Sequence, residues 1–334
     1  MIRKGERNLI TDVAGLKVGN AEDFDIRTGV TVILPDAPMA AVADIRGGAP
    51  GTRETDALDP VSLVEGIDGL FLSGGSAFGL DAGGGVQAHL RVLGRGYEVA
   101  PGLPRVPVVA GAILFDLASG GNKYWDVSPY TDLGRRAAAA CGLDFALGNA
   151  GAGLGAIAGT YKGGLGSASA VRDDGVTVGA LVAVNPVGSP LMPGTDAFWA
   201  WPFELEGEFG GRRPSGPVTA SGLPADLKGR VEPCTNTTIA VVATDAILTR
   251  VELKRLAIMA ADGFARALRP VHTPFDGDLV YAVSTGLKPL RVPGPLAVLE
   301  LGALAADTLS RAIARGVYEA ETLGGICSYR DRYK

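Results

Sequence analysis

The sequence is poor in histidine and cysteine. Its 334 residues include 2 histidines and 3 cysteines. Catalysis that depends on histidine therefore has only His89 and His272 as candidates. The cysteines, Cys141, Cys234 and Cys327, are odd in number and lack the spacing of a metal site or a disulfide framework. They fit a protein of the reducing cytoplasm.

Neither a charge of one sign nor a long apolar run dominates the chain. The 31 basic and 36 acidic residues leave a net charge of −5, without any run rich in lysine and arginine, so we expect no nucleic-acid partner. Apolar runs such as 176–184 are interrupted and far shorter than a membrane span, so we expect no membrane partner. Residues 1–7 lack the apolar core of a signal peptide, which again favours the cytoplasm.

Glycine, in contrast, is abundant. It occupies 49 of the 334 positions, roughly twice the usual share of about 7%. Because 47% of the residues are hydrophobic and the net charge is small, the chain is not disordered. The glycines do not recur at every third position, which excludes collagen. The sequence therefore predicts a folded protein with many tight turns, and its length fits one large domain or two ordinary ones.

Short β-rich runs alternate with helical patterns along the chain. We expect strands at 30–34, 40–45, 69–72, 107–109, 169–171, 176–184, 239–243 and 279–284, and helices at 80–93, 132–141, 250–268 and 296–319. This alternation favours an α/β sandwich with strand layers between helices. The run 151–156 only approximates a dinucleotide-binding motif and is interpreted as close-packed turn backbone. Segment 205–232, rich in Gly, Pro, Ser and charge, is expected to be a mobile surface loop.

A first candidate for chemistry is the strand-to-helix turn at 73–79. A serine hydrolase would have Gly-x-Ser-x-Gly here, but Phe78 stands two positions after Ser76. Nothing in the sequence connects either histidine to Ser76. A glycine turn in which Ser76 caps a helix is the favoured interpretation.

A second candidate is Thr237, which lies between the expected loop and the strand at 239–243. Threonine is a weak nucleophile unless a base is beside it, and its own α-amine can be that base. A free α-amine titrates at about 7.7 to 8, close to neutral pH. Thr237 has such an amine only if the Asn236–Thr237 bond is cut. Otherwise Asn236 and Thr237 are ordinary turn residues before a strand.

Two further candidates lie at strand ends. Asp276-Gly277-Asp278 precedes the strand at 279–284 and is either a turn or a carboxylate pair whose repulsion raises one pKa. An EF-hand is excluded because the remaining ligands are missing. Asn185, followed by Pro186, ends the strand at 176–184; it either starts a turn or donates to an oxyanion.

Several segments together resemble one known family. The matching segments are Thr-Asn-Thr-Thr-Ile-Ala-Val-Val-Ala-Thr-Asp-Ala at 235–246, and the stretches at 8–13, 46–55, 72–79 and 161–166. They resemble the L-aminopeptidase D-Ala-esterase/amidase family, which includes β-peptidyl aminopeptidases and nylon-oligomer (6-aminohexanoate-oligomer) hydrolases. The resemblance covers nearly the whole chain in family order.

The resemblance implies a fold and a maturation step. The fold is a four-layer αββα sandwich of the N-terminal-nucleophile type, a single domain cleaved into two chains. Cleavage at Asn236–Thr237 gives an α-chain, 1–236, and a β-chain, 237–334. The fragments stay associated, and the αβ units form a homo-oligomer, for which a tetramer is one expectation.

The resemblance also implies roles for individual residues. Thr237 becomes the nucleophile, Asp276 and Asp278 the paired acidic groups, Asn185 the oxyanion donor and Lys162 a supporting cation. No cofactor and no metal is implied. The substrate is a small amide or peptide.

Two details refine the expected activity. The double-Asp triplet with an Asn-Thr cleavage bond is more similar to the nylon-oligomer hydrolases, whereas peptidase members often have a Ser-Gly-Glu-like triplet. Phe115-Asp116 stands where several aminopeptidases have an active-site tyrosine, which leaves Tyr124 and Tyr161 as candidates.

The expected activity is hydrolysis of linear amides through an acyl-enzyme on Thr237. Substrates would be 6-aminohexanoate oligomers, or peptides and β-peptides cleaved by aminopeptidase action. Two alternatives are an acyltransferase of the ornithine acetyltransferase type and a self-cleaved non-enzymatic scaffold.

Overall fold

The computed structural model describes residues 2–228, 236–292 and 294–334, and two sheets dominate it. In spatial order, the six-stranded sheet contains β1 (Arg3–Lys4), β10 (Gly164–Val171), β11 (Thr177–Asn185), β12 (Thr237–Ala246), β13 (Leu279–Lys288) and β4 (Ala40–Ile45). Its strands pair antiparallel except for β12 and β13, which are parallel.

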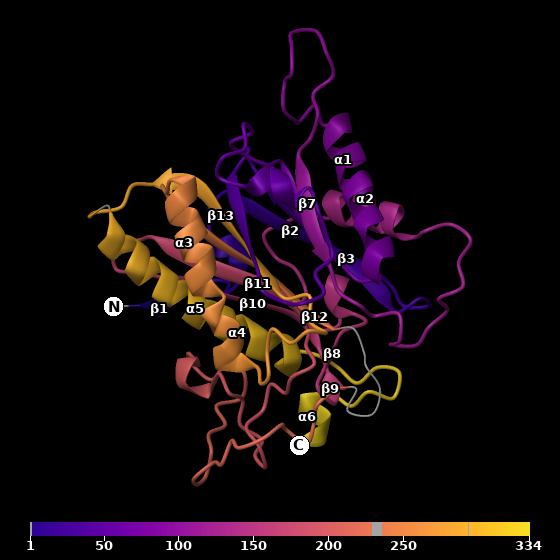
Figure 1. Ribbon diagram of the computed structural model, residues 1–334, viewed down its shortest axis with the longest axis vertical. Helices are drawn as coiled ribbons and strands as arrows, with labels where there is room; N and C mark the ends of the chain where they lie inside the picture. Colours follow the sequence, from indigo (N-terminus) through magenta and orange to yellow (C-terminus); the bar gives the residue numbers. More distant parts are fainter. Residues whose placement is uncertain (1, 229–235, 293) are drawn as a thin grey trace.

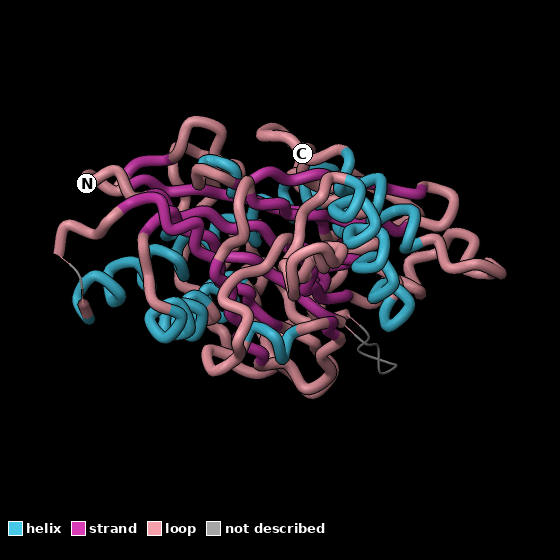
Figure 2. The backbone as a smooth tube through the Cα atoms, turned by 90° about the horizontal axis from the view of Figure 1, so that it is seen from above, coloured by secondary structure: helices cyan, strands magenta, loops and turns pink. Residues whose placement is uncertain are grey.

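The second sheet has five strands. Their order is β2 (Leu16–Asp23), β3 (Thr28–Pro35), β6 (Gly69–Ser73), β7 (Val109–Ile113) and β5 (Thr52–Arg53). A separate short hairpin pairs β8 (Ile157–Ala158) with β9 (Tyr161–Lys162). Figure 2 shows the strands gathered through the middle of the molecule.

Helices cover the outer face of each sheet (Figure 1). α1 (Ala82–Val92) and α2 (Tyr130–Ala139) pack on the five-stranded sheet, and α3 (Arg250–Ala260), α4 (Asp262–Ala267) and α5 (Pro295–Tyr318) lie on the side of the six-stranded sheet. The short helix α6 (Tyr329–Arg332) lies near the end of the chain, and 3-10 turns occur at Ile10–Asp12, Thr55–Leu58, Ser76–Asp81, Gly151–Gly153 and Trp201–Phe203. The expected αββα sandwich is confirmed.

Strand β12 shows why the sequence takes this arrangement. All ten of its residues are buried, because the strand has neighbours on both faces and both edges. Ile239 and Val241 belong to the apolar core between the two sheets, whereas Ala240 and Val242 belong to the core under α3, α4 and α5. A continuous β-branched and small apolar run suits a strand that is covered on both faces.

The structure refines several expectations from the sequence. The helix expected at 250–268 is two helices, α3 and α4, and strand β2 was not expected. Ser76 does not cap a helix; it begins a 3-10 turn with a φ of 53°, after Gly75 at 86°. Gly151–Gly153 is a close-packed turn, as interpreted, since a Cβ atom on Gly153 would lie 2.1 Å from the Leu165 nitrogen.

The segment expected to be mobile contains neither helix nor strand from 205 to 228 apart from its turns, and 229–232 lies outside the described residues. Near its start, however, Glu208 is buried, and its carboxylate pairs with Arg311 at 2.5 Å. Phe209 is 1% exposed. The segment is thus fixed to α5 at this point, and its mobility stays a prediction.

Two observations bear on the cysteines and on membranes. Cys141 and Cys327 carry free thiols, and Cys234 lies outside the described residues. Within 2–228, 236–292 and 294–334, no helix has the length and apolarity needed to cross a bilayer.

Candidate active site

Thr237 and Asn185 meet at one end of the six-stranded sheet. Asn185 is the last residue of β11, Thr237 is the first of β12, and the antiparallel register pairs them directly. Both are buried, with Thr237 3% and Asn185 0% exposed. Two residues that are 52 positions apart (237 − 185) therefore lie side by side, as the oxyanion role expected for Asn185 requires.

Asp276 and Asp278 reach the same edge. They directly precede β13, which runs parallel to β12, so the starts of the two strands lie together. Asn236 forms a parallel bridge with Asp276. The Gly277 N–H donates to the Asn236 carbonyl oxygen at 2.9 Å, and the Thr237 hydroxyl donates to the same oxygen at 2.5 Å. The hydroxyl and a main-chain donor thus converge on the carbonyl of the expected cleavage bond.

Glycine is required in this turn by close backbone approach. A Cβ atom on Gly277 would lie 2.7 Å from Thr237 Oγ1 and 2.6 Å from the Ala49 carbonyl oxygen. On the facing segment, a Cβ atom on Gly47 would lie 2.3 Å from the Asp278 nitrogen. Both contacts are shorter than side chains tolerate, so the two glycines permit the loops to pack against the nucleophile.

The Asp276 carboxylate is held by three donors. Its Oδ1 accepts from the Val187 N–H at 3.2 Å, and its Oδ2 accepts from the Thr273 N–H at 3.0 Å and the Thr273 hydroxyl at 2.5 Å. Burial, and next the charge of Asp278, raise the pKa of Asp276 above its ordinary value of 3.8. The raised pKa that the sequence predicts for one member of the pair is found here.

Asp278 is held beside Thr237. Its Oδ1 accepts from the Thr238 N–H at 2.7 Å, and its Oδ2 accepts from the His272 N–H at 3.0 Å. The His272 Nδ1 also lies 3.0 Å from Oδ2. Sequence reasoning found no partner for this histidine. The six-residue separation from Asp278 follows no periodic pattern, so the sequence carries no signal for the contact.

The Asn185 amide has a fixed orientation. Its Oδ1 accepts from the Ile157 N–H at 3.0 Å and from Lys228 Nζ at 2.8 Å, and its Nδ2 donates to the Phe115 carbonyl at 3.1 Å. An amide nitrogen carries two N–H donors. One is directed to Phe115, which leaves the other for an oxyanion.

Lys162 is connected to Asn185 through Ile157. It pairs with Ile157 in the β8–β9 hairpin, and Ile157 contacts Asn185. The Lys162 ammonium donates to the Gly163 carbonyl at 2.7 Å and the Gly153 carbonyl at 3.0 Å. Burial is the main cause that lowers the pKa of Lys162 from 10.5 to about 7.

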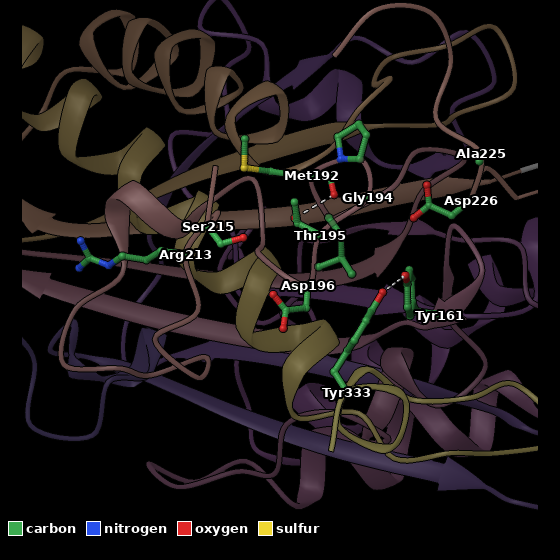
Figure 3. Close-up of a pocket in the computed structure, with 12 residues that line it drawn as sticks. Tyr161, Met192, Gly194, Thr195, Asp196, Arg213, Ser215, Ala225, Asp226 and Tyr333 are labelled. Atoms are coloured by element: carbon green, nitrogen blue, oxygen red, sulfur yellow. Dashed lines mark hydrogen bonds between the residues drawn. The ribbon is translucent and has the colours of Figure 1, made fainter. Parts of the chain in front are cut away.

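Neither tyrosine candidate contacts the nucleophile through a described hydrogen bond. Tyr124 is 95% exposed. The Tyr161 hydroxyl lies 2.8 Å from that of Tyr333. The rings of Tyr161 and Tyr333 line a pocket of about 650 Å³ that also contains Asp196 and Asp226 (Figure 3). Phe115 contributes its carbonyl, not its ring, to the site.

Two solved structures share this fold. The L-aminopeptidase D-Ala-esterase/amidase of Ochrobactrum anthropi, described as a variant of the Ntn (N-terminal-nucleophile) hydrolase fold, has a TM-score of 0.67 and 21% identity over 95% of this chain and 88% of that one. A Burkholderia sp. β-aminopeptidase has a TM-score of 0.67 and 25% identity over 96% and 89%. The fold is therefore that of the N-terminal-nucleophile hydrolases.

The family follows from the sequence comparison. The chain belongs to peptidase family S58, whose model matches residues 8–330. It is 44% identical to an uncharacterised aminopeptidase of Mycobacterium tuberculosis over 98% of both chains. It is 31% identical to a 6-aminohexanoate-oligomer endohydrolase of Kocuria sp., over 84% of this chain and 76% of that one. The protein is an amide hydrolase, and the acyltransferase alternative is not favoured.

Proposed function

We propose that the chain cuts itself between Asn236 and Thr237 and that Thr237 then hydrolyses linear amides through an acyl-enzyme. One observation supports this most strongly. The Thr237 hydroxyl and the Gly277 N–H both donate to the Asn236 carbonyl oxygen, at 2.5 and 2.9 Å. A nucleophile beside a carbonyl that a main-chain donor polarises is the geometry that acyl transfer needs.

Self-cleavage proceeds in two steps. Thr237 Oγ attacks the Asn236 carbonyl carbon, the C–N bond breaks, and the hydroxyl proton passes through Asp276, Asp278 or water to the departing amine. Water then hydrolyses the Asn236 ester and frees both ends. The β-branch of Thr237 restricts χ1 and helps to hold Oγ in place. The Gly277 N–H stabilises the oxyanion in this reaction.

Substrate hydrolysis uses the same residues after cleavage. The free Thr237 amine takes the proton of its own hydroxyl, whose oxygen attacks the substrate carbonyl carbon. The protonated amine then gives that proton to the substrate nitrogen as the C–N bond breaks and the amine product leaves. The remaining Asn185 N–H stabilises the oxyanion, and Lys162 adds positive charge behind it. Asp276 and Asp278 orient the Thr237 amine. Water then releases the acyl group.

The order of the strands supports lasting association of the fragments. In the six-stranded sheet, β12 and β13 of the β-chain lie between β11 and β4, which belong to the α-chain. Separation would break both rows of interstrand hydrogen bonds and expose a core strand. Assembly of these αβ units into a homo-oligomer, and a cytoplasmic location, stay predictions.

The relatives define the substrates to test first. They are named as an aminopeptidase and as an endohydrolase of 6-aminohexanoate oligomers, and one structural neighbour as a β-aminopeptidase. We therefore propose peptides or β-peptides with a free amino end, and linear 6-aminohexanoate oligomers, as alternative substrates. The Asp276-Gly277-Asp278 triplet favours the oligomers as substrates, whereas the 44% identity to the mycobacterial uncharacterised aminopeptidase favours the peptides.

The test replaces the nucleophile. Thr237→Ala should stay a single full-length chain by gel and intact mass, whereas the wild type yields two fragments cut after Asn236. Thr237→Ser, which keeps the hydroxyl, should still be cut. The cleaved enzyme is then assayed with free and N-acetylated peptides, β-peptides and aminohexanoate oligomers. Two fragments from Thr237→Ala would exclude the proposal.

A further inference from the structure

Lys228 contacts the site, although no sequence motif includes it. Its ammonium donates to Asn185 Oδ1 at 2.8 Å and lies 3.4 Å from the Ile157 carbonyl oxygen. The residue stands eight positions before Asn236 (236 − 228), in the part of the α-chain that leads to the expected cleavage bond. Any role of Lys228 in catalysis rests on the proposed oxyanion function of Asn185.

The contact controls which way the amide faces. With Oδ1 toward Lys228 and Ile157, the amide makes three hydrogen bonds within the part of the chain that the structure describes, and none of them uses its second N–H. The flipped amide would place its NH2 group against two donors and its oxygen against the Phe115 carbonyl. A cation on Oδ1 also polarises the amide and makes its N–H a stronger donor.

The segment around Lys228 has anchors that do not depend on the cleavage bond. The Lys228 N–H donates to the Val187 carbonyl at 3.0 Å, and the Ser189 hydroxyl donates to Asp226 Oδ2 at 2.5 Å. Gly159 allows the backbone at Asp226 to pack closely against it, since a Cβ atom on Gly159 would lie 2.5 Å from the Asp226 carbonyl oxygen. These contacts keep Lys228 beside Asn185 after the chain is cut. Asp226 itself faces the pocket of Figure 3.

We propose that Lys228 is a positioning residue for amide hydrolysis. Its ammonium fixes and polarises the Asn185 amide, so that the free N–H is directed to the oxyanion of the acyl-transfer step. Lys228 acts through Asn185. The α-chain therefore supplies a part of the site from the segment just before its own new end.

A second consequence concerns Lys162. Two charged groups act on this lysine besides burial: Asp116 raises its pKa, and Lys228 lowers it. Removing the charge of Lys228 therefore raises the pKa of Lys162 from about 7.

The experiment compares cleaved enzymes carrying Lys228→Met, Lys228→Gln and Lys228→Arg. Rates are normalised to the concentration of Thr237 that reacts with an acyl probe. We expect Lys228→Met and Lys228→Gln to lower kcat about tenfold with KM within about twofold, because the lost interaction acts on the transition state. Lys228→Arg, which keeps the charge and the donors, should stay within about threefold of wild type. The control is Lys254→Met, which removes a half-buried lysine that donates to the Ala43 carbonyl and not to Asn185.

A double mutant separates this proposal from the one on which it rests. If Lys228 acts through Asn185, the Lys228→Met/Asn185→Ala enzyme should be no slower than Asn185→Ala alone. A slow Asn185→Ala enzyme with a normal Lys228→Met enzyme, or with additive losses, would overturn the role of Lys228 only. A normal Asn185→Ala enzyme would instead remove the oxyanion role of Asn185, and with it this proposal. Self-cleavage of Thr237 would be untouched by either result.

Discussion

The two halves of the candidate site hold their polar groups in opposite ways. In the half that follows residue 236, the carboxylates of Asp276 and Asp278 accept hydrogen bonds chiefly from main-chain N–H groups. In the half that precedes residue 236, Lys162 and the Asn185 amide nitrogen donate to main-chain carbonyls. Thr237 lies between the two halves. Each half therefore uses the backbone of its loops as the partner for buried side chains, with the direction of donation reversed.

Burial shifts the pKa values of ionisable groups in the two halves in opposite directions. It raises the pKa of Asp276 and lowers the pKa of Lys162 to about 7. Both shifts favour the neutral form of the group, because a buried site disfavours isolated charges. Proton transfer between oxygen and nitrogen becomes easier when the two kinds of group titrate closer to neutral pH. We therefore expect substitutions in the two halves to have different effects on self-cleavage and on stability.

The largest effect is expected on the carboxylate side. Asp278→Asn places an NH2 group against the N–H of either Thr238 or His272, because these two donors bond to different oxygens of the carboxylate. We expect this to displace the strand that begins with Thr237. We expect about a 100-fold loss in the rate of self-cleavage and about 1–3 kcal/mol of unfolding free energy. Asp276→Asn should lower the rate of self-cleavage about tenfold. The loss is smaller because the raised pKa of Asp276 means that this position already favours a neutral side chain.

The measurement is the fraction of cut chain against time on a denaturing gel, together with urea unfolding of the uncut chain. Asp132→Asn, on the exposed face of α2, is the control. Equal rates for Asp276→Asn and Asp278→Asn would contradict the division of roles between the two carboxylates.

A smaller effect tests the turn between the two carboxylates. In Gly277→Ala the new methyl would lie 2.7 Å from Thr237 Oγ1 and 2.6 Å from the Ala49 carbonyl. The turn must shift, so the Gly277 N–H leaves the Asn236 carbonyl, and we expect self-cleavage to slow by at least about tenfold. Gly84→Ala, in α1 with open space around the Cβ position, is the matched control and should be cut normally. Wild-type cleavage of Gly277→Ala would refute the donor role of this N–H.

The last expected effect is on stability rather than on cleavage, and it is a pH dependence that arises from Lys162. The folded chain releases the Lys162 proton near pH 7, whereas the unfolded chain holds it up to about 10.4. Between these values the unfolded state binds more protons, so the free energy of unfolding rises with pH by up to about 1.4 kcal/mol per pH unit. Lys162→Met should flatten this slope between about pH 7 and 9.5. Urea unfolding of both chains in the uncut Thr237→Ala background measures it, and parallel slopes would contradict the lowered pKa.

Much of the fold could be predicted from local patterns. The strand β4 and the helix α5 fall within a residue or so of the expected ranges, because β-branched runs and helical apolar spacing are local signals. The split between α3 and α4 was missed, since Ala261 and Asp262 carry no breaker. Strand β2 was missed because Gly19, Asn20 and two acidic residues hide its β character.

The residues of the candidate site likewise divide into those that local patterns predict and those that they do not. Thr237, Asn185 and the Asp276-Gly277-Asp278 triplet are visible in the sequence because they stand at strand ends and in family motifs. His272 and Lys228 are not, because their partners lie in other parts of the chain or at a spacing without periodicity. The Gly277 N–H is invisible for a different reason, since a main-chain donor has no side-chain signature.

The sequence by itself determined the classes of element, the α/β character, and the residues able to act as nucleophile, acid and amide donor. Only the tertiary structure decided that Asn185 and Thr237 pair across β11 and β12, that β12 and β13 lie between α-chain strands, and which backbone groups hold each side chain. The physical reason is that strand register and order are set by burying every apolar face at once, which no local segment encodes.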